Sequence, residues 1–171
     1  MLKTELAFVG LGSNLGNGRQ NLLAAWQRLG EIPGIEILRL SSPYLTEPLG
    51  IVTEHWFTNA VGEIRTGLQP EALLAHMLQI EEEMGRNRSM TDDRPVDLDL
   101  LYFADLVLRS ETLTLPHPAL SGRLFVLAPL AELAPALLHP LLGQTTLELL
   151  RECEMPGRVE RQEWLSAEGE M

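Results

Sequence analysis

The stretch 94–103, which reads RPVDLDLLYF, constrains this chain more than any other. Apolar residues alternate there with Asp97 and Asp99, a period that predicts a β-strand with both carboxylates on one face, roughly 7 Å apart. The apolar run 101–103 favours a buried strand, where unpaired carboxylates are costly. Mg²⁺ removes that cost, because it takes one or two carboxylates and completes its shell with water and phosphate oxygens. Alternatively, one aspartate lies on the surface at the strand end while the other pairs with an arginine.

Positive charge is scarce in this chain and is concentrated in arginine. The net charge of -11 argues against binding to nucleic acid, which needs a broad basic surface. Three arginines, Arg86, Arg88 and Arg94, lie close together in the sequence. Guanidinium groups bind phosphate oxygens in a bidentate geometry, so this cluster is a candidate phosphate site. A solvated loop is the alternative for the same residues.

The length of 171 residues fits one domain with a full-sized core. We expect that domain over residues 1–155, followed by a polar, acidic tail over 156–171 whose composition is compatible with poor order. Cys153 is the only cysteine, which excludes an intramolecular disulfide and a cysteine-built zinc site. No apolar run reaches transmembrane length, and 6–11 is too short for a secretory signal, so we expect a cytoplasmic protein without a membrane partner.

The order of the predicted elements indicates an α+β fold. Strands are expected at 6–11, 35–40, 57–64 and 94–103, and helices at 22–30 and 70–85, with 81–83 as a solvated helix face. This order is that of the ferredoxin-like βαββαβ core, an antiparallel sheet with helices packed on it. A turn at 104–105 is expected to form a hairpin from the 94–103 strand into 106–108, followed by a short extended piece at 113–115. This C-terminal hairpin and helices near 123–130 and 145–151 are expected as additions.

Three further patterns leave functional and structural readings open. Phe57 and Asn59 share one strand face, so an aromatic ring and an amide could read a flat heterocycle, although a core Phe with a capping Asn is the alternative. The turn 12–16, GSNLG, lets a ligand approach the backbone but is neither a Walker loop nor a Rossmann fingerprint. His117 lies between two prolines. It could donate a hydrogen bond to phosphate, or it could be a surface residue.

Taken together, these motifs resemble the 6-hydroxymethyl-7,8-dihydropterin pyrophosphokinase family over roughly residues 6–135. Four blocks carry the resemblance in the family's order: Gly12-Ser13-Asn14-Leu15; Glu47-Pro48-Leu49-Gly50 with Phe57 and Asn59; Glu81 with Arg86, Arg88, Arg94, Asp97, Leu98 and Asp99; and Pro116-His117-Pro118 with Arg123, Phe125 and Pro129. The combination is far more specific than any one motif.

The resemblance implies an enzyme of folate biosynthesis that transfers the diphosphate of ATP to 6-hydroxymethyl-7,8-dihydropterin and releases AMP. It implies two Mg²⁺ ions held by Asp97 and Asp99, with ATP as co-substrate and a monomeric chain. The implied catalytic residues are Arg86, Arg94, Asp97 and Asp99. The implied ATP-binding residues are Glu81, Arg86, Arg88, Arg94, Thr114, His117 and Arg123. The implied pterin-binding residues are Pro48, Leu49, Phe57, Asn59 and Phe125.

The chain departs from the family pattern in the loop 86–93, where Ser89-Met90-Thr91-Asp92-Asp93 replaces a longer basic run containing Trp-Gly-Pro. We expect this loop to act as a lid. Two other functions remain open at this stage. A ferredoxin-like domain could bind a metabolite without chemistry, or a metal-dependent nucleotidyltransferase could use another acceptor and release pyrophosphate.

Overall fold

Residues 3–48, 55–85 and 93–165 are described by the structure, a computed structural model. Their elements are, in chain order, β1 (Glu5–Ser13), α1 (Gly18–Gly30), β2 (Ile35–Leu40), β3 (Tyr44–Thr46), β4 (Phe57–Thr66), α2 (Pro70–Glu83), β5 (Asp97–Phe103), β6 (Leu108–Arg109), β7 (Thr114–Leu115), the 3₁₀ turn η1 (Leu120–Gly122), α3 (Leu124–Leu133), α4 (Thr146–Glu152) and β8 (Val159–Arg161). The expected α+β class with an antiparallel sheet is confirmed.

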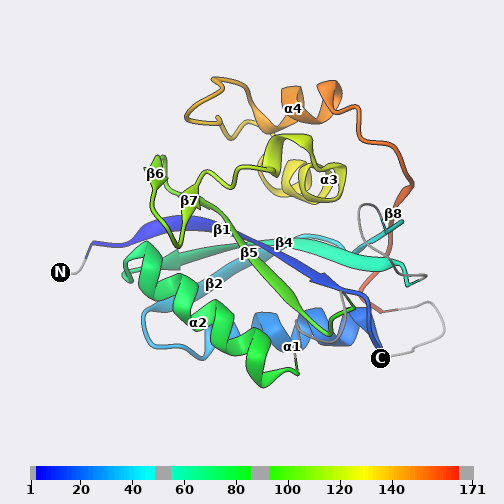
Figure 1. The fold of residues 1–171 in the computed structure, drawn as a ribbon, viewed down its shortest axis with the longest axis horizontal. Coiled ribbons are helices and arrows are strands. Elements are labelled where there is room, and N and C mark those ends of the chain that lie inside the picture. The colour runs from blue at the N-terminus through cyan, green and yellow to red at the C-terminus, as the bar shows by residue number, and fades with distance from the viewer. Residues whose placement is uncertain (1–2, 49–54, 86–92, 166–171) are drawn as a thin grey trace.

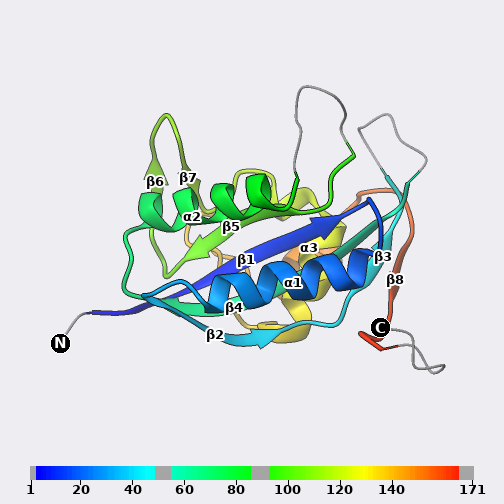
Figure 2. The same cartoon turned by 90° about the horizontal axis from the view of Figure 1, so that it is seen from below.

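Within these residues, six strands form one antiparallel sheet in the order β5, β1, β4, β3 and β8, with β2 also paired to β4. The helices α1 and α2 cover one face of this sheet, while α3 and α4 lie over the other (Figures 1 and 2). The strands β6 and β7 pair separately as a small hairpin. The molecule is therefore a sheet between two helical layers.

Alternation along the strands divides the core into two clusters. Val9 of β1 packs with Leu22 of α1 and Met77 of α2, all fully buried. On the opposite face, Phe8 packs with Leu127 of α3. Successive side chains of one strand therefore pack against different helical layers, as the two-residue period of a strand requires.

The same alternation holds along the start of β5 and the residue before it, as the sequence predicts. Val96, Leu98 and Leu100 are buried in the cluster beneath α1 and α2. Asp97 and Asp99 are only partly buried and line a pocket on the face that carries α3. Packing of the apolar face thus fixes the side on which the two carboxylates lie.

Two short strands have no counterpart in the expected elements. β3 pairs with β4, and β8 pairs with β3 at the far edge of the sheet. β8 lies inside the segment 156–171 that we expected to be a polar tail, so 159–161 is an ordered strand and not a poorly ordered one. The solvated helix face expected at 81–83 is also wrong for Glu81, which is buried.

Gly62 of β4 is required by the packing of Trp26. A Cβ atom at this position would overlap the indole ring of Trp26, which is itself largely buried in the core. We expect Gly62→Ala to lower the free energy of unfolding by about 1–3 kcal/mol, because the core must shift to admit the methyl group. Gly10→Ala is the matched control, since a Cβ there meets only Leu101 at an ordinary 3.5 Å. Denaturant unfolding of both variants checks this, and equal losses would contradict it.

His139 makes folding stability depend on pH. Its ring is buried against Tyr102, with the centroids 5.8 Å apart, and its Nδ1 accepts hydrogen bonds from the backbone N–H groups of Leu141 and Leu142. Burial lowers the pKa of His139 below its ordinary value of 6.5. The folded chain therefore binds fewer protons at this site than the unfolded chain does.

Because the pKa is lowered on folding, stability is full above pH 6.5 and falls as the pH drops below that value. We expect His139→Asn to flatten the decline in unfolding free energy between pH 7 and 5. Asparagine keeps an acceptor for the two N–H groups but cannot be protonated. Denaturant unfolding across this range measures the slope, and an unchanged slope in the variant would refute the assignment.

Candidate active site

A pocket of about 150 Å³ opens beside the two aspartates, between the sheet and the start of α3. Asp97 and Asp99 come from β5, and their side chains are 27% and 33% exposed. The other lining residues come from β1, β3, β4, α3 and the segments next to β5 and α3: Gly10, Leu11, Gly12, Thr46, Glu47, Phe57, Asn59, Ala60, Arg94, Arg123, Phe125 and Val126. Residues distant in sequence thus surround the predicted metal ligands.

A second pocket, of about 270 Å³, lies on the other side of Asp99. Thr114 of β7 and His117 line it, together with Asp99. Asp99 therefore belongs to both pockets. This arrangement suits an enzyme that holds two substrates and lets them react where the pockets meet.

Two arginines and a histidine surround the carboxylates at long distances. Arg94 Nη1 lies 3.5 Å from Asp97 Oδ2, and Arg123 Nη1 lies 3.9 Å from Asp99 Oδ2. His117 Nε2 is 3.8 Å from Asp99 Oδ1. Contacts this long are weak, so the groups can exchange partners when an anionic ligand arrives.

The same two arginines contact the aromatic residues of the pocket. The guanidinium carbon of Arg94 lies 5.5 Å from the ring centre of Phe57, and that of Arg123 lies 5.6 Å from the ring centre of Phe125. Both distances are those of cation–π contacts. Each arginine therefore stands between an aromatic ring and a carboxylate, where a flat ligand and a phosphate chain would meet.

Asn59 is held in a fixed orientation at the bottom of this pocket. It is 6% exposed, and its Nδ2 donates a hydrogen bond of 2.8 Å to Thr46 Oγ1. A Cβ on the neighbouring Gly12 would lie 2.9 Å from Asn59 Oδ1, so only glycine allows this close approach. The amide is thus preset to read the edge of a ligand beside Phe57.

The turn after β1 anchors the arginine that precedes β5. Asn14 Oδ1 accepts the backbone N–H of Arg94 at 2.6 Å, and the Asn14 N–H donates to the Arg94 carbonyl at 3.0 Å. Asn14 Nδ2 also donates to Asp93 Oδ1 at 2.8 Å. Sequence reasoning singled out this turn as a place for a ligand to approach but missed its contact with Arg94.

Glu81 lies behind the aspartate strand. Its side chain is buried, and Oε2 accepts the backbone N–H of Leu98 at 2.6 Å. Leu98 stands between Asp97 and Asp99 in the chain, so this bond fixes the backbone that carries both carboxylates. The ATP-binding role implied by the resemblance stays a prediction.

His117 is neutral in this environment. Burial lowers its pKa below the ordinary value, and the charge of Arg123 lowers it further, while Asp97 acts in the opposite direction. Its Nδ1 accepts the backbone N–H of Ala119 at 3.2 Å, which leaves the proton on Nε2. Nε2 faces Asp99, so His117 presents a hydrogen-bond donor to the pocket it lines.

Most of the residues predicted for the site are brought together. One pocket contains Arg94, Asp97, Asp99, Arg123, Phe57, Asn59 and Phe125, and the neighbouring pocket contains Thr114 and His117. Pro48 follows the pocket residue Glu47 but is not among the lining residues. Leu49, Arg86, Arg88 and most of the expected lid fall outside the described residues. Thr46 and Asn14 were not predicted as site residues.

The two aspartates fit Mg²⁺ better than a metal enclosed by protein ligands. Over 3–48, 55–85 and 93–165, no group of three or more His, Cys, Asp or Glu side chains could hold a metal ion. Mg²⁺ needs only one or two carboxylates, because water and substrate phosphates complete its octahedral shell. Asp97 and Asp99 are partly exposed and next to cationic side chains, which is the setting that a Mg²⁺–phosphate ligand requires.

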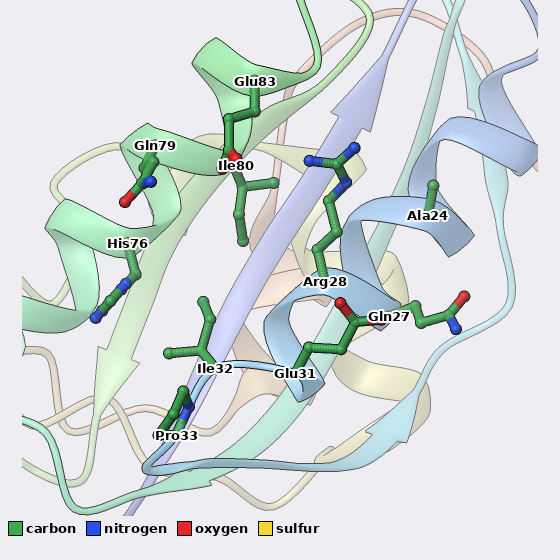
Figure 3. Close-up of a pocket in the computed structure, with 10 residues that line it drawn as sticks. All are labelled: Ala24, Gln27, Arg28, Glu31, Ile32, Pro33, His76, Gln79, Ile80 and Glu83. Atoms are coloured by element: carbon green, nitrogen blue, oxygen red, sulfur yellow. The ribbon is translucent and has the colours of Figure 1, made fainter.

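A larger hollow of about 610 Å³ lies between α1 and α2 (Figure 3). Arg28 and Glu31 line it from the end of α1, and His76 and Glu83 line it from α2. It shares no residue with either pocket at the aspartates. The chemistry of the lining, and not the size of the hollow, therefore identifies the candidate active site.

Comparison with known proteins agrees with this site. A sequence model of the 7,8-dihydro-6-hydroxymethylpterin-pyrophosphokinase family matches residues 8–135. The chain is 39% identical to a 2-amino-4-hydroxy-6-hydroxymethyldihydropteridine pyrophosphokinase of Methylorubrum extorquens, covering 92% of this chain and 98% of that protein. It is 38% identical to the enzyme of the same name from Pseudomonas aeruginosa, covering 92% and 96%.

Similarity extends to larger proteins that contain further regions. The chain is 38% identical to the folic acid synthesis protein fol1 of Schizosaccharomyces pombe, covering 91% of this chain but only 21% of that protein. The crystal structure of Plasmodium falciparum HPPK-DHPS with pteroate has the same fold, with a TM-score of 0.73 at 17% identity, covering 88% of this chain and 44% of that one.

Among the helices of the described residues, none combines the length and apolar character needed to cross a bilayer. The family match covers the strands, turns and helices that build both pockets, and it includes every described residue predicted for the site. The chain belongs to the 7,8-dihydro-6-hydroxymethylpterin pyrophosphokinase family, the ATP-dependent diphosphotransferases of folate synthesis.

Proposed function

We propose that this chain transfers the diphosphate of ATP to the hydroxymethyl group of 6-hydroxymethyl-7,8-dihydropterin and releases AMP. One observation carries the proposal. Asp99 lines both pockets, and Asp97 lies beside it with Arg94 within 3.5 Å. The carboxylates therefore lie where a nucleotide in one pocket would meet a flat acceptor in the other.

The pterin occupies the pocket that contains the aromatic rings. Phe57 from β4 and Phe125 from α3 line it and stack on the two faces of the pterin ring. Asn59, oriented by Thr46, reads the hydrogen-bonding edge of the ring. An analogue without that edge would leave the remaining hydrogen-bonding capacity of the Asn59 amide without a ligand partner, which is costly and makes the site selective.

ATP occupies the pocket beyond Asp99. Thr114 and His117 line this pocket, and the neutral imidazole of His117 donates a hydrogen bond to phosphate through Nε2. Arg94 and Arg123 move from their long contacts with Asp97 and Asp99 to phosphate oxygens, where a bidentate geometry is available. Their release also clears the faces of the two phenylalanine rings.

Asp97 and Asp99 hold Mg²⁺, with two ions predicted. A metal held by these two carboxylates would supply charge neutralisation for the triphosphate. The hydroxyl oxygen of the pterin bonds to the β-phosphorus, the bond from that phosphorus to the α,β-bridging oxygen breaks, and AMP leaves with the bridging oxygen. The hydroxyl proton passes to water, and no general base is assigned. The chain's own residues act by binding, orientation and charge.

The two alternative functions are not favoured. A binding domain without chemistry has no use for paired carboxylates between two pockets. A nucleotidyltransferase would release pyrophosphate instead of AMP. The family membership of the chain supports the diphosphotransferase over both.

The finer features of the fold also remain proposals. The strand order β5, β1, β4, β2 within the antiparallel sheet supports a ferredoxin-like core, with β3, β8, the hairpin and the last two helices as additions. The single domain over 1–155, the monomeric state and the cytoplasmic location stay predictions.

Release of AMP tests the proposed reaction. Purified chain is incubated with ATP and Mg²⁺, with and without 6-hydroxymethyl-7,8-dihydropterin, and AMP is separated from ADP. We expect AMP only when the pterin is present, in equal amounts with the pterin diphosphate. Pterin binding without AMP would favour a binding domain, and pterin-dependent pyrophosphate would favour a nucleotidyltransferase.

A further inference from the structure

The C-terminal residues 158–164 lie outside the part of the chain that the family model matches, which is 8–135. They nevertheless contact the strand that borders the pterin pocket. β8 pairs with β3 in the register Tyr44 to Arg161 and Thr46 to Val159. Two further backbone hydrogen bonds extend this pairing, from Glu47 N–H to the Arg158 carbonyl and from Gln162 N–H to the Pro43 carbonyl, at 3.2 and 2.8 Å.

The paired strand β3 provides part of the pterin pocket. Thr46 and Glu47 line the pocket, and Thr46 Oγ1 accepts the hydrogen bond that orients Asn59. A strand of three residues has little stability of its own, so its position depends on its neighbours. On its outer side that neighbour is β8.

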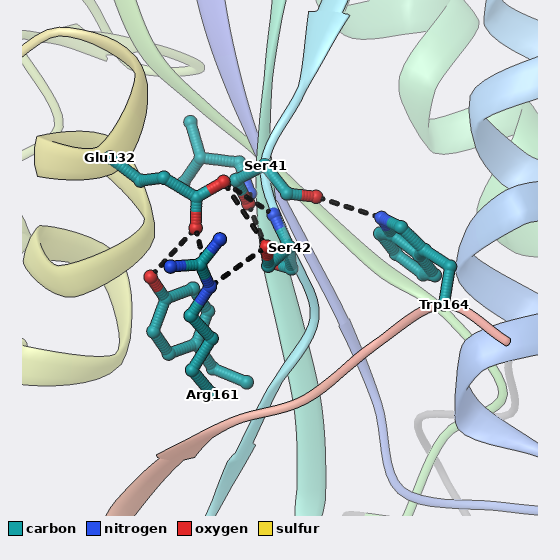
Figure 4. A network of polar contacts seen from close by, with 7 residues as sticks. Ser41, Ser42, Glu132, Arg161 and Trp164 are labelled. Atoms are coloured by element: carbon teal, nitrogen blue, oxygen red, sulfur yellow. Dashed lines mark hydrogen bonds and ion pairs between the residues drawn. The ribbon is translucent and has the colours of Figure 1, made fainter. Parts of the chain in front are cut away.

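Glu132 connects the same edge to α3, the helix that carries Phe125. Its Oε1 accepts the Tyr44 hydroxyl at 2.8 Å, and its Oε2 accepts the Ser42 N–H at 2.8 Å. Arg161 Nε lies 3.6 Å from Glu132 Oε1 and donates to Ser42 Oγ at 3.0 Å (Figure 4). Burial and the Glu132 contact raise the pKa of Tyr44 to about 12, so its hydroxyl stays a donor.

The end of the segment is anchored to other parts of the fold. Trp164 Nε1 donates to the Ser41 carbonyl at 3.0 Å, and its ring packs against the core cluster beneath α1 and α2 (Figure 4). Arg19 of α1 donates to the Glu163 carbonyl at 3.0 Å. Arg158 lies 3.3 Å from Glu47 and over the ring of Trp56, next to Phe57. The segment thus reaches from Glu47, which lines the pterin pocket, to α1 on the other face of the sheet.

We infer that residues 158–164 form a strap that positions the pterin half of the active site. The strap holds β3, and through Thr46 it orients Asn59. Through Arg161 and Glu132 it sets the position of α3, and with it Phe125, relative to the sheet. Glu132 and Arg161 are positioning residues, because neither lines the pocket at the aspartates.

The strap is tested in the full chain by replacing Gln162, whose backbone N–H binds Pro43. Gln162→Pro removes this donor, while the control Gln162→Ala keeps it. We expect proline to raise KM for the pterin about tenfold, with kcat and KM for ATP changed less than about twofold. Alanine leaves all three unchanged. Equal increases in both KM values, or no increase for the pterin, would overturn the inference.

The kinetic readout rests on the proposed function, so a second readout is independent of it. The Asn59 side-chain amide resonances in NMR spectra report its bond to Thr46. We expect them to shift in Gln162→Pro but not in Gln162→Ala, even if the wild-type chain releases no AMP. Unshifted resonances in the proline variant would overturn the strap.

If Gln162→Pro does not fold, Glu132→Gln tests the inference in its place. The amide nitrogen of this variant would face a hydrogen-bond donor, either the Ser42 N–H or the Tyr44 hydroxyl, so one of these two hydrogen bonds would be lost. The same selective rise in KM for the pterin supports the strap, and unchanged kinetics refute it.

Discussion

Asp97→Asn is expected to lower kcat for AMP formation by about 10²–10³-fold while the chain stays folded. Asparagine has the same shape as aspartate but lacks the charge that binds Mg²⁺ and balances the arginines. Asp97 Oδ2 lies 3.5 Å from Arg94 Nη1, and loose pairs of this kind contribute about 1 kcal/mol or less to stability. The loss should therefore appear in turnover and not in unfolding.

Turnover at several Mg²⁺ concentrations, together with denaturant unfolding, checks this expectation. Asp105→Asn serves as the control, because Asp105 is an exposed residue in the turn after β5. It removes the same charge just beyond the opposite end of β5, at a residue that lines neither pocket. A near-normal rate for Asp97→Asn at limiting Mg²⁺ would show that the metal assignment is wrong.

The central strand and its chemistry are predictable because one local pattern encodes them. The alternation around Asp97 and Asp99 places three apolar side chains against the helices, and packing then leaves the carboxylates on the opposite face. The helix beginning at Pro70 is equally local, since its first residue and apolar spacing define it. A helix or strand can be predicted from the sequence when its own apolar spacing determines which side chains it buries.

β3 and β8 could not be predicted, because each has three residues and depends on partners far along the chain. Their stability comes from the pairing of Tyr44 with Arg161 and from the indole of Trp164, which no periodicity reveals. The polar composition of 156–171 suggested a poorly ordered tail for the same reason, because composition does not reveal that a single side chain anchors the segment to the fold.

The pocket arrangement also required tertiary structure. Phe57 and Phe125 are 68 residues apart in the sequence, and their meeting at Asp99 follows from sheet order and the placement of α3. The resemblance named these residues, but spacing alone could not have brought them together. Glu81 shows the converse error, since a charged run on a helix usually faces solvent and this member of it does not.

Glu81→Ala is expected to lower both stability and turnover, because Glu81 holds the strand that carries the metal ligands. β5 is the edge strand of the sheet, and the Leu98 N–H points to Glu81 Oε2 at 2.6 Å instead of to another strand. Removing the acceptor leaves a buried N–H unsatisfied, which costs about 1–3 kcal/mol. The carboxylates on either side of Leu98 lose their fixed position, and we expect kcat to fall about 10- to 100-fold.

Two variants separate this role from direct nucleotide binding. Glu81→Gln keeps an oxygen acceptor for the Leu98 N–H, so it should restore most of the stability and turnover lost in Glu81→Ala. Glu82→Ala, at an exposed neighbouring position, should change neither. A Glu81→Ala chain with normal unfolding and a raised KM for ATP would make Glu81 a nucleotide ligand instead. If Glu81→Ala lowers both kcat and the free energy of unfolding, and Glu81→Gln restores them, then the two aspartates function only while the Glu81 side chain holds the Leu98 N–H of their strand.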